Sequence, residues 1–149
     1  MTSRYRLRPN PDTPFCMDVP DSWVDETVYL FQGPTRDGLQ HSIVVTCDRD
    51  VHGDSLDAYA TPRIAQAVYA LPDADLLTDD VIALDDGSAA RRFILRWTAH
   101  ERSLYQHNVC LVAEGMGFML SATFTAASRR EVGDEIDRIM RSFAVTRPV

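Results

Sequence analysis

The segment from residue 81 to residue 125 constrains the fold most, because it consists of strand patterns joined by short turns. Strands are predicted over residues 81–84, 89–99, 103–113 and 118–125. Asp85-Asp86-Gly87 and the stretch from Glu114 to Gly117 contain the residue types that form tight turns. Because such short turns join only antiparallel neighbours, this segment predicts a four-stranded antiparallel meander.

Three more strands are expected nearer the amino terminus, over residues 15–19, 26–32 and 42–46. The first is a short apolar run closed by Pro20, and the second alternates until Gly33-Pro34 ends it. Asp37-Gly38 is a turn signal, and the β-branched apolar run that follows it suits the third strand. The second and third strands are therefore predicted to form a hairpin.

A first helix is predicted between this hairpin and the meander. Asp54 or Ser55 can cap apolar residues that recur at intervals of three and four until Pro72 ends the pattern. Pro62 lies inside this pattern. It can kink the helix, or it can mark the true first turn and leave residues 54–61 as a separate shorter turn.

A second helix is predicted after Ser128, which is expected to cap it. Glu131 occupies the third helical position, as in a capping box. One stripe of this helix carries the apolar residues Val132, Ile136, Ile139, Met140 and Phe143. This spacing predicts a helix that packs on the sheet.

Seven predicted strands and two helices that do not alternate with every strand indicate an α+β fold with a twisted, largely antiparallel sheet. No repeat or long linker divides the chain, so residues 1–149 are expected to form a single domain. A hydrophobic content of 45% over 149 residues is enough for one core without metals or disulfides.

The charge of the chain disfavours several classes of partner. Fifteen basic residues, all arginine, stand against 22 acidic residues and give a net charge of −7, which repels a phosphate backbone or an anionic lipid surface. The longest apolar stretch, around residues 116–122, is far shorter than the roughly 20 residues that span a bilayer. Residues 1–8 are followed by prolines and not by an apolar run, so no secretory signal is recognised. We therefore expect a cytoplasmic protein that binds no nucleic acid and does not insert into membranes.

The sequence predicts no metal site and no cofactor. The four histidines occur singly, without an HxH or HExxH pattern, and Cys16, Cys47 and Cys110 form no CxxC pair. The Gly115-Met116-Gly117 segment has too few glycines for a phosphate loop and is expected to be a hairpin turn.

No catalytic arrangement is recognised either, so the chain is predicted not to be an enzyme. The residue types closest to a nucleophile and base set are His107, Cys110 and Ser121. Asp79-Asp80 and Asp85-Asp86 flank the predicted strand 81–84, where buried like charges would repel each other. Both acidic pairs are therefore expected in solvated turns.

Two predicted strands have faces that a simple two-layer core does not explain. In strand 26–32 both faces are apolar, and in strand 103–113 one face carries Gln106 and Asn108 beside Cys110. One interpretation is that the helices cover one sheet face while a loop or a second subunit covers the other, and a homodimer is accordingly predicted. The other interpretation is an open apolar face, rimmed by amides, for a partner segment.

The chain also resembles a known family, the DcrB-related proteins. The resemblance rests on Phe15-Cys-Met-Asp-Val-Pro-Asp-Ser-Trp23, Thr27-Val-Tyr-Leu-Phe31, His41-Ser-Ile-Val-Val-Thr46 with Asp48-Arg49, Arg96-Trp97, Leu104-Tyr-Gln106 and Ser142-Phe143. Cytoplasmic members of about this length resemble the effector-associated (Eag) chaperones of bacterial type VI secretion. The resemblance implies a PsbP-like fold, a dimer, and binding of the amino-terminal transmembrane helices of effectors that carry PAAR domains, which are then loaded on the secretion spike.

The resemblance also implies where a client segment binds. The paired aliphatics of the family's groove fall on Val28 and Leu30, its hydroxyls on Ser42 and Thr46, and its amide on Gln106 with Asn108 two residues on. Pro62-Arg63 stands where the family pattern favours a continuous helix with a polar residue, so no contact from that helix is carried over from the resemblance.

Two other functions remain open at this point. The first is a PsbP-like or DcrB-like accessory domain that binds another ligand. The second is a small enzyme that uses His107, Cys110 or Ser121. Because a fold does not determine a function, the chaperone interpretation depends on the family resemblance more than on site chemistry.

Overall fold

The computed structural model describes residues 4–6, 17–24, 26–49, 51 and 53–146. Within these residues, eight strands and two helices follow in this order: β1 Arg4–Arg6, β2 Asp18–Pro20, β3 Val28–Arg36, β4 Leu39–Asp48, α1 Leu56–Ala70, β5 Asp75–Ala83, β6 Ala89–Ala99, β7 Arg102–Ala113, β8 Met116–Thr125 and α2 Arg129–Arg141. This arrangement confirms the predicted α+β class.

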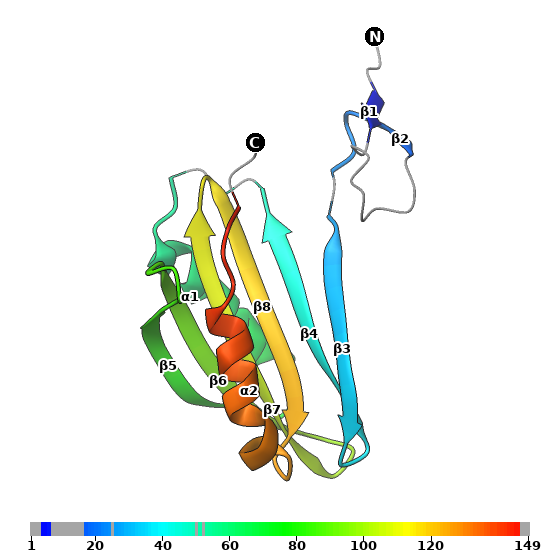
Figure 1. Cartoon of the computed structure of the whole chain (residues 1–149), viewed down its shortest axis with the longest axis vertical. Helices are drawn as coiled ribbons and strands as arrows, with labels where there is room; N and C mark the ends of the chain where they lie inside the picture. The colour runs from blue at the N-terminus through cyan, green and yellow to red at the C-terminus, as the bar shows by residue number, and fades with distance from the viewer. Residues whose placement is uncertain (1–3, 7–16, 25, 50, 52, 147–149) are drawn as a thin grey trace.

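Six of the strands form one antiparallel sheet in the order β3-β4-β8-β7-β6-β5 (Figure 1). The predicted meander is the run of neighbours from β5 to β8, and the predicted hairpin is β3-β4. The first predicted strand falls partly outside the described residues, and its described part, β2, pairs with β1 in a separate two-stranded sheet.

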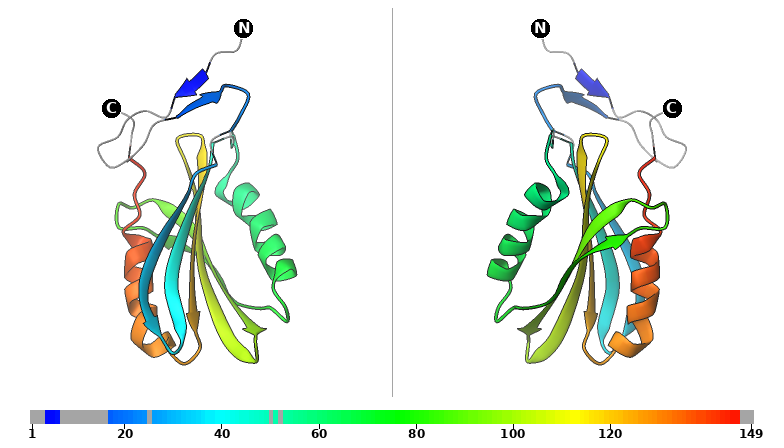
Figure 2. Two further views of the ribbon diagram at one scale, coloured as in Figure 1. Left: turned by 90° about the vertical axis from the view of Figure 1, so that its right-hand side faces the viewer. Right: turned by 90° about the vertical axis from the view of Figure 1, so that its left-hand side faces the viewer.

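The two helices lie on opposite faces of the six-stranded sheet (Figure 2). On the side that we call the α1 face, Tyr59, Ala60 and Ile64 of the helix are buried against Phe93, Leu95 and Cys110. On the other side, the α2 face, Val132, Ile136 and Met140 pack against a larger cluster that includes Val109, Leu120 and Phe124. The sheet is therefore the middle layer of three.

Helix α1 runs without interruption through Pro62. Ser55 is its N-cap, and the Ser55 hydroxyl accepts a hydrogen bond from the amide of Ala58 at 3.1 Å. Proline in a helix interior removes one backbone hydrogen bond, but burial of one apolar side of α1 offsets this loss. The alternative of a separate shorter turn before Pro62 does not form.

Helix α2 starts after Ser128 as predicted, but the predicted capping box between Ser128 and Glu131 does not form. The buried Ser128 hydroxyl donates to the carbonyl oxygen of Thr125 at 3.1 Å and makes no cap hydrogen bond. Glu131 instead pairs with Arg36 of β3 at 3.3 Å. Ser128 has helical backbone angles, which direct its side chain back toward β8 rather than along the first turn of α2.

Several strand boundaries differ from the prediction, and the differences in β3 and β5 are the largest. β3 does not end at Gly33-Pro34 but continues to Arg36, with a register shift between Gln32 and Thr35. A proline is tolerated there because β3 is an edge strand and the bulge interrupts the ladder. β5 begins at Asp75, so it is longer than the predicted strand and contains Asp79 and Asp80.

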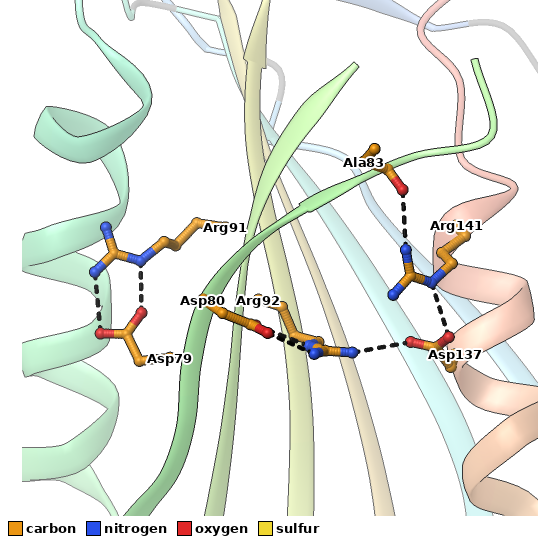
Figure 3. A network of polar contacts seen from close by, with 7 residues as sticks. All are labelled: Asp79, Asp80, Ala83, Arg91, Arg92, Asp137 and Arg141. Atoms are coloured by element: carbon orange, nitrogen blue, oxygen red, sulfur yellow. Dashed lines mark hydrogen bonds and ion pairs between the residues drawn. The ribbon is translucent and has the colours of Figure 1, made fainter. Parts of the chain in front are cut away.

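The expectation that Asp79 and Asp80 lie in a solvated turn is therefore wrong. Consecutive strand residues point to opposite faces, and each carboxylate meets an arginine of β6 (Figure 3). Asp79 pairs with Arg91, and Asp80 pairs with Arg92 at 2.6 Å. These hydrogen bonds lower the pKa of both carboxyl groups. The strand alternation thus separates the two charges, and the arginines neutralise them.

The two arginines also connect the sheet to both helices. Arg91 reaches Asp57 of α1 at 2.7 Å. Arg92 reaches Asp137 of α2 at 3.4 Å, as Figure 3 shows. Asp137 in turn pairs with Arg141 at 2.8 Å, and Arg141 donates to the carbonyl oxygen of Ala83 at 3.0 Å. This network fixes the position of each helix over the β5–β6 side of the sheet.

No helix within the described residues is long and apolar enough to cross a membrane.

Candidate functional site

The six residues predicted to bind a client share one face of the sheet. Val28 pairs with Thr46 across β3 and β4, and Ser42 lies on the same side two positions from Val44, the partner of Leu30. Strand β8 lies between β4 and β7 and extends the same rows of paired residues. Thr123 of β8 pairs with Ser42 and Gln106, and Ser121 of β8 pairs with Val44 and Asn108. All six belong to the α1 face, because the next row of β7 contains Cys110, which packs against α1.

Helix α1 covers only part of this face. It packs against β6 and β7, so β3, β4 and much of β8 are left without a helix above them (Figure 1). Val28 and Leu30 are 55% and 56% exposed on this side. We call the uncovered part the open face, and it consists of Val28, Leu30, Ser42, Val44, Thr46, Gln106, Met119, Ser121 and Thr123.

Of the predicted residues, Asn108 differs from the others because it is fully buried. The Asn108 amide nitrogen donates to the Gln106 side-chain oxygen at 3.1 Å, and the Ser121 hydroxyl donates to the Asn108 oxygen at 2.6 Å. Asn108 therefore orients the polar groups of Gln106 and Ser121 from below. Gln106 and Ser121 are half-buried and lie at the surface of the open face.

The site prediction did not include Val44, Met119 or Ser121 as surface residues of the open face. Strand alternation from Ser42 and Thr46 would have placed Val44 on the same side. Met119 and Ser121 could not be assigned in this way, because only the pairing of β8 between β4 and β7 brings them there.

Two hollows follow the edge of α1 along the open face. The first has a volume of about 340 Å³ and is bounded by Val28, Thr46, Tyr59 and Arg63 among others. The second has a volume of about 280 Å³, and its lining includes Arg63, Leu71, Gln106 and Met119. Both hollows therefore combine apolar side chains with hydrogen-bonding groups.

Arg63 stands between the two hollows. Its guanidinium carbon lies 3.6 Å from the centre of the Tyr59 ring, and one of its nitrogens is 3.1 Å from the carboxylate of Asp48. Another nitrogen donates to the Tyr59 carbonyl oxygen at 2.8 Å. These contacts hold the side chain against α1 and the end of β4.

His107, Cys110 and Ser121 do not form a nucleophile and base set. His107 packs on the α2 face, because it neighbours the α1-facing Asn108 in β7, whereas Cys110 and Ser121 belong to the α1 face. Burial raises the pKa of the Cys110 thiol to about 12, so the thiol is protonated at neutral pH. The sheet itself separates the proposed base from both nucleophiles.

Within the described part of the chain, no cluster of three or more His, Cys, Asp or Glu side chains could hold a metal ion. Cys47 is half-buried, Cys110 is buried, and Cys16 lies outside the described residues.

Comparison with known proteins adds the family. The family model for DcrB matches residues 15–142. The chain belongs to the DcrB family. A comparison with curated protein sequences gives no match for this DcrB-family chain.

Solved structures show the fold of this DcrB-family chain again. A Pseudomonas aeruginosa protein of unknown function, described as a putative regulator, has a TM-score of 0.73 at 21% identity over 99% of both chains. PsbP from the cyanobacterium Synechocystis has a TM-score of 0.58 at 11% identity, covering 98% of this chain and 94% of its own. LpqN of Mycobacterium tuberculosis, involved in cell envelope biogenesis, has a TM-score of 0.53 at 14% identity, with 93% and 87% covered. The predicted PsbP-like fold is confirmed.

His107 predicts a pH dependence of folding. Burial lowers the His107 pKa from 6.5 to about 4, and Nε2 has no hydrogen-bond partner among the described residues. The folded chain keeps the ring neutral, whereas the unfolded chain protonates it below pH 6.5. The free energy of unfolding is therefore at its full value above pH 6.5 and decreases as the pH falls toward 4. Between pH 7.5 and pH 5 we expect a loss of about 2 kcal/mol in the free energy of unfolding.

Urea denaturation at these two pH values measures this loss. His107→Leu should remove most of the difference, and the smaller contribution of His41, whose pKa burial also lowers, should remain. His100→Asn is the control, because His100 is exposed. Asparagine is chosen because it tolerates the positive φ of 50° that the backbone has at this turn. An unchanged pH dependence in His107→Leu would contradict the assignment.

Proposed function

We propose that this DcrB-family chain is a non-catalytic chaperone and adaptor whose open face binds an apolar helical segment of a partner protein. The observation that carries the proposal is the exposure of Val28 and Leu30 beside the ordered polar groups of Gln106 and Ser121. The resemblance to the effector-associated chaperones of type VI secretion supplies the partner: the amino-terminal transmembrane helices of an effector with a PAAR domain. In this proposal the chain shields those helices in the cytoplasm and helps to load the effector on the secretion spike.

The physical basis of client binding is that the open face replaces water around the apolar side chains of the client helix. A transmembrane segment in water exposes apolar area at a cost of about 25 cal/mol per Å², and contact with Val28, Leu30, Val44 and Met119 removes part of that area. Kinks or small residues in such a helix leave backbone groups accessible. The hydroxyls of Ser42, Thr46 and Ser121 and the amide of Gln106 can form hydrogen bonds to those groups.

The experiment that tests the function is co-expression with an effector fragment that contains its apolar helices. We expect the fragment to become soluble and to co-purify with the chain, because the open face covers area that otherwise drives aggregation. A PAAR-domain reading frame beside the gene for this chain identifies the fragment to use. Solubility of the fragment without the chain, or aggregation in its presence, would contradict the proposal.

A homodimer is part of the same proposal. The edge strand β3 exposes large apolar side chains on both faces, with Tyr29 57% and Phe31 62% exposed opposite Val28 and Leu30. The other edge strand, β5, is protected by Asp75, Asp79 and Asp80 and by a register shift, whereas residues 28–35 of β3 carry no charge. A second copy at β3 would cover this unprotected edge.

We expect static light scattering to report twice the chain mass of 16.8 kDa at micromolar concentration. Tyr29→Arg should shift the species toward the monomer, because a charge on the edge strand opposes strand pairing. Val81→Arg, an exposed apolar residue on the opposite edge strand, serves as the matched control. A monomer in the unmodified chain would contradict this part of the proposal.

The second candidate is an accessory binding domain with another ligand, which the likeness to PsbP in fold supports. The co-expression experiment separates the two, since this alternative predicts no rescue of the effector fragment.

A further inference from the structure

A separate hollow lies on the α2 face, on the side of the sheet away from the open face. It is bounded by β3, by β4 and by helix α2, and its volume is about 160 Å³. Apolar side chains form most of its wall: Phe31, Pro34, Ile43, Val132, Ile136 and Ile139. A cavity of about 150 Å³ with such a lining accepts a benzene ring. The hollow therefore has room for one large apolar side chain.

The hollow exists because α2 packs on β8 and leaves the edge strand beyond it uncovered. β3 bulges between Gln32 and Thr35, where Gly33 contributes no side chain. Phe31 and Ile139 form two opposite rims, and both are exposed. The buried His41 contributes to the lining, and burial lowers its pKa, so its ring is uncharged at neutral pH.

One carboxylate lines the hollow, that of Glu135 on α2. Glu135 is exposed and takes part in no hydrogen bond or ion pair within the described part of the chain. The nearby Arg36 is paired with Glu131, one helical turn earlier. The Glu135 charge beside the apolar wall is therefore available to a basic group.

We propose that this hollow docks a protein segment that inserts one large aliphatic or aromatic side chain and places a lysine or arginine against Glu135. Charge complementarity selects this partner, because a basic group beside the anchor is attracted by Glu135 and an acidic flank would be repelled. A protein segment fits better than a membrane surface, since the net charge of −7 repels anionic lipid. The hollow lies on the α2 face and shares only Ser42 with the open face, so the chain can hold an apolar client on one side and a second protein on the other.

Three synthetic helical peptides of alanine and glutamine can test the proposal. The first carries Leu with Arg four residues later, the second carries Leu with Glu, and the third carries Ala with Arg. NMR titration follows the methyl groups of Ile43, Ile136 and Ile139 in the hollow and those of Val28 and Leu30 on the open face. We expect the Leu/Arg peptide to shift these signals with a dissociation constant of the order of 1 mM, since a single anchor supplies most of the contact. The Leu/Glu peptide should bind at least about threefold more weakly, and the Ala/Arg peptide should cause no shift.

Variants of the exposed residues complete the test. Glu135→Arg should reverse the preference, so that the Leu/Glu peptide binds more tightly than the Leu/Arg peptide. Ile139→Asp should abolish binding of both. Asp134→Arg changes a neighbouring exposed acid that does not line the hollow, and it should leave the order of the peptides unchanged. Thermal unfolding confirms that each variant is folded.

Several results would overturn the proposal. Equal binding of the Leu/Arg and Leu/Glu peptides would remove the role of Glu135. Shifts confined to Val28 and Leu30 would assign the peptide to the open face. If Ile139→Asp instead halves the mass in light scattering and the peptides do not bind, the hollow is an interface between two copies.

Discussion

Leu30→Asp is expected to abolish binding of an apolar client segment while the protein remains folded. The side chain is 56% exposed and lies on the edge strand of the open face, between the rows of Val28 and Gln32. A carboxylate at this position would have to be buried against hydrocarbon when the client binds, at a cost of several kcal/mol. In the unbound chain the same carboxylate remains in water, so the melting temperature should change by only a few degrees.

A pull-down with the co-expressed effector fragment, measured beside thermal unfolding, tests this expectation. Val81→Asp is the matched control, because it introduces the same charge at an exposed apolar side chain, 61% exposed, on the opposite edge strand β5 and outside the open face. Gln106→Ala should weaken binding by about 1 kcal/mol, since it removes one hydrogen bond at a half-buried site. If Leu30→Asp unfolds the chain, or if Val81→Asp alone prevents binding, the assignment of the open face is wrong.

Gly117→Ala is expected to be strongly destabilising, by about 3 kcal/mol or more. A methyl group at Gly117 would lie 2.2 Å from a ring carbon of Tyr59, far inside contact distance. The Tyr59 ring is 2% exposed and is held under the Arg63 guanidinium. It therefore has little room to move, and α1 would have to shift away from β8.

Gly133→Ala provides the opposite control, because a methyl group there meets nothing within 4 Å and the residue is inside α2. This change should stabilise the protein by about 0.5 to 1 kcal/mol through helix propensity. Tyr59→Leu should recover part of the stability of Gly117→Ala by opening space beside residue 117. Urea denaturation gives the free energies of unfolding. A Gly117→Ala variant as stable as the unmodified chain would contradict the close packing of α1 on the sheet.

The order of strands and helices followed from local signals in the sequence. Alternating polarity predicted the four strands from β5 to β8, and the intervals of three and four predicted α1 and α2. Gly38 and Gly87 have positive φ values of 72° and 87°, which is why turn residues marked these reversals reliably. Such patterns are properties of neighbouring residues, so they can be recognised without knowledge of the tertiary structure.

The acidic pair Asp79-Asp80 is an example of a structure that neighbouring residues in the sequence do not predict. Two adjacent carboxylates resemble a solvated turn in the sequence, yet the partners that allow them in a strand, Arg91 and Arg92, lie on the next strand. Pro62 is similar, because only the buried contacts of α1 offset the hydrogen bond that it removes.

The candidate site was also predicted only in part from the sequence. Alternation placed Val28 with Leu30, and Gln106 with Asn108, on common faces, and the family resemblance supplied the pairing of those faces. The sequence alone did not distinguish the buried Asn108 from the half-buried Gln106, nor did it predict that α1 stops short of β3 and β4. Burial depends on which distant segment crosses a face of the sheet, so the tertiary structure alone decided which of these side chains water can reach.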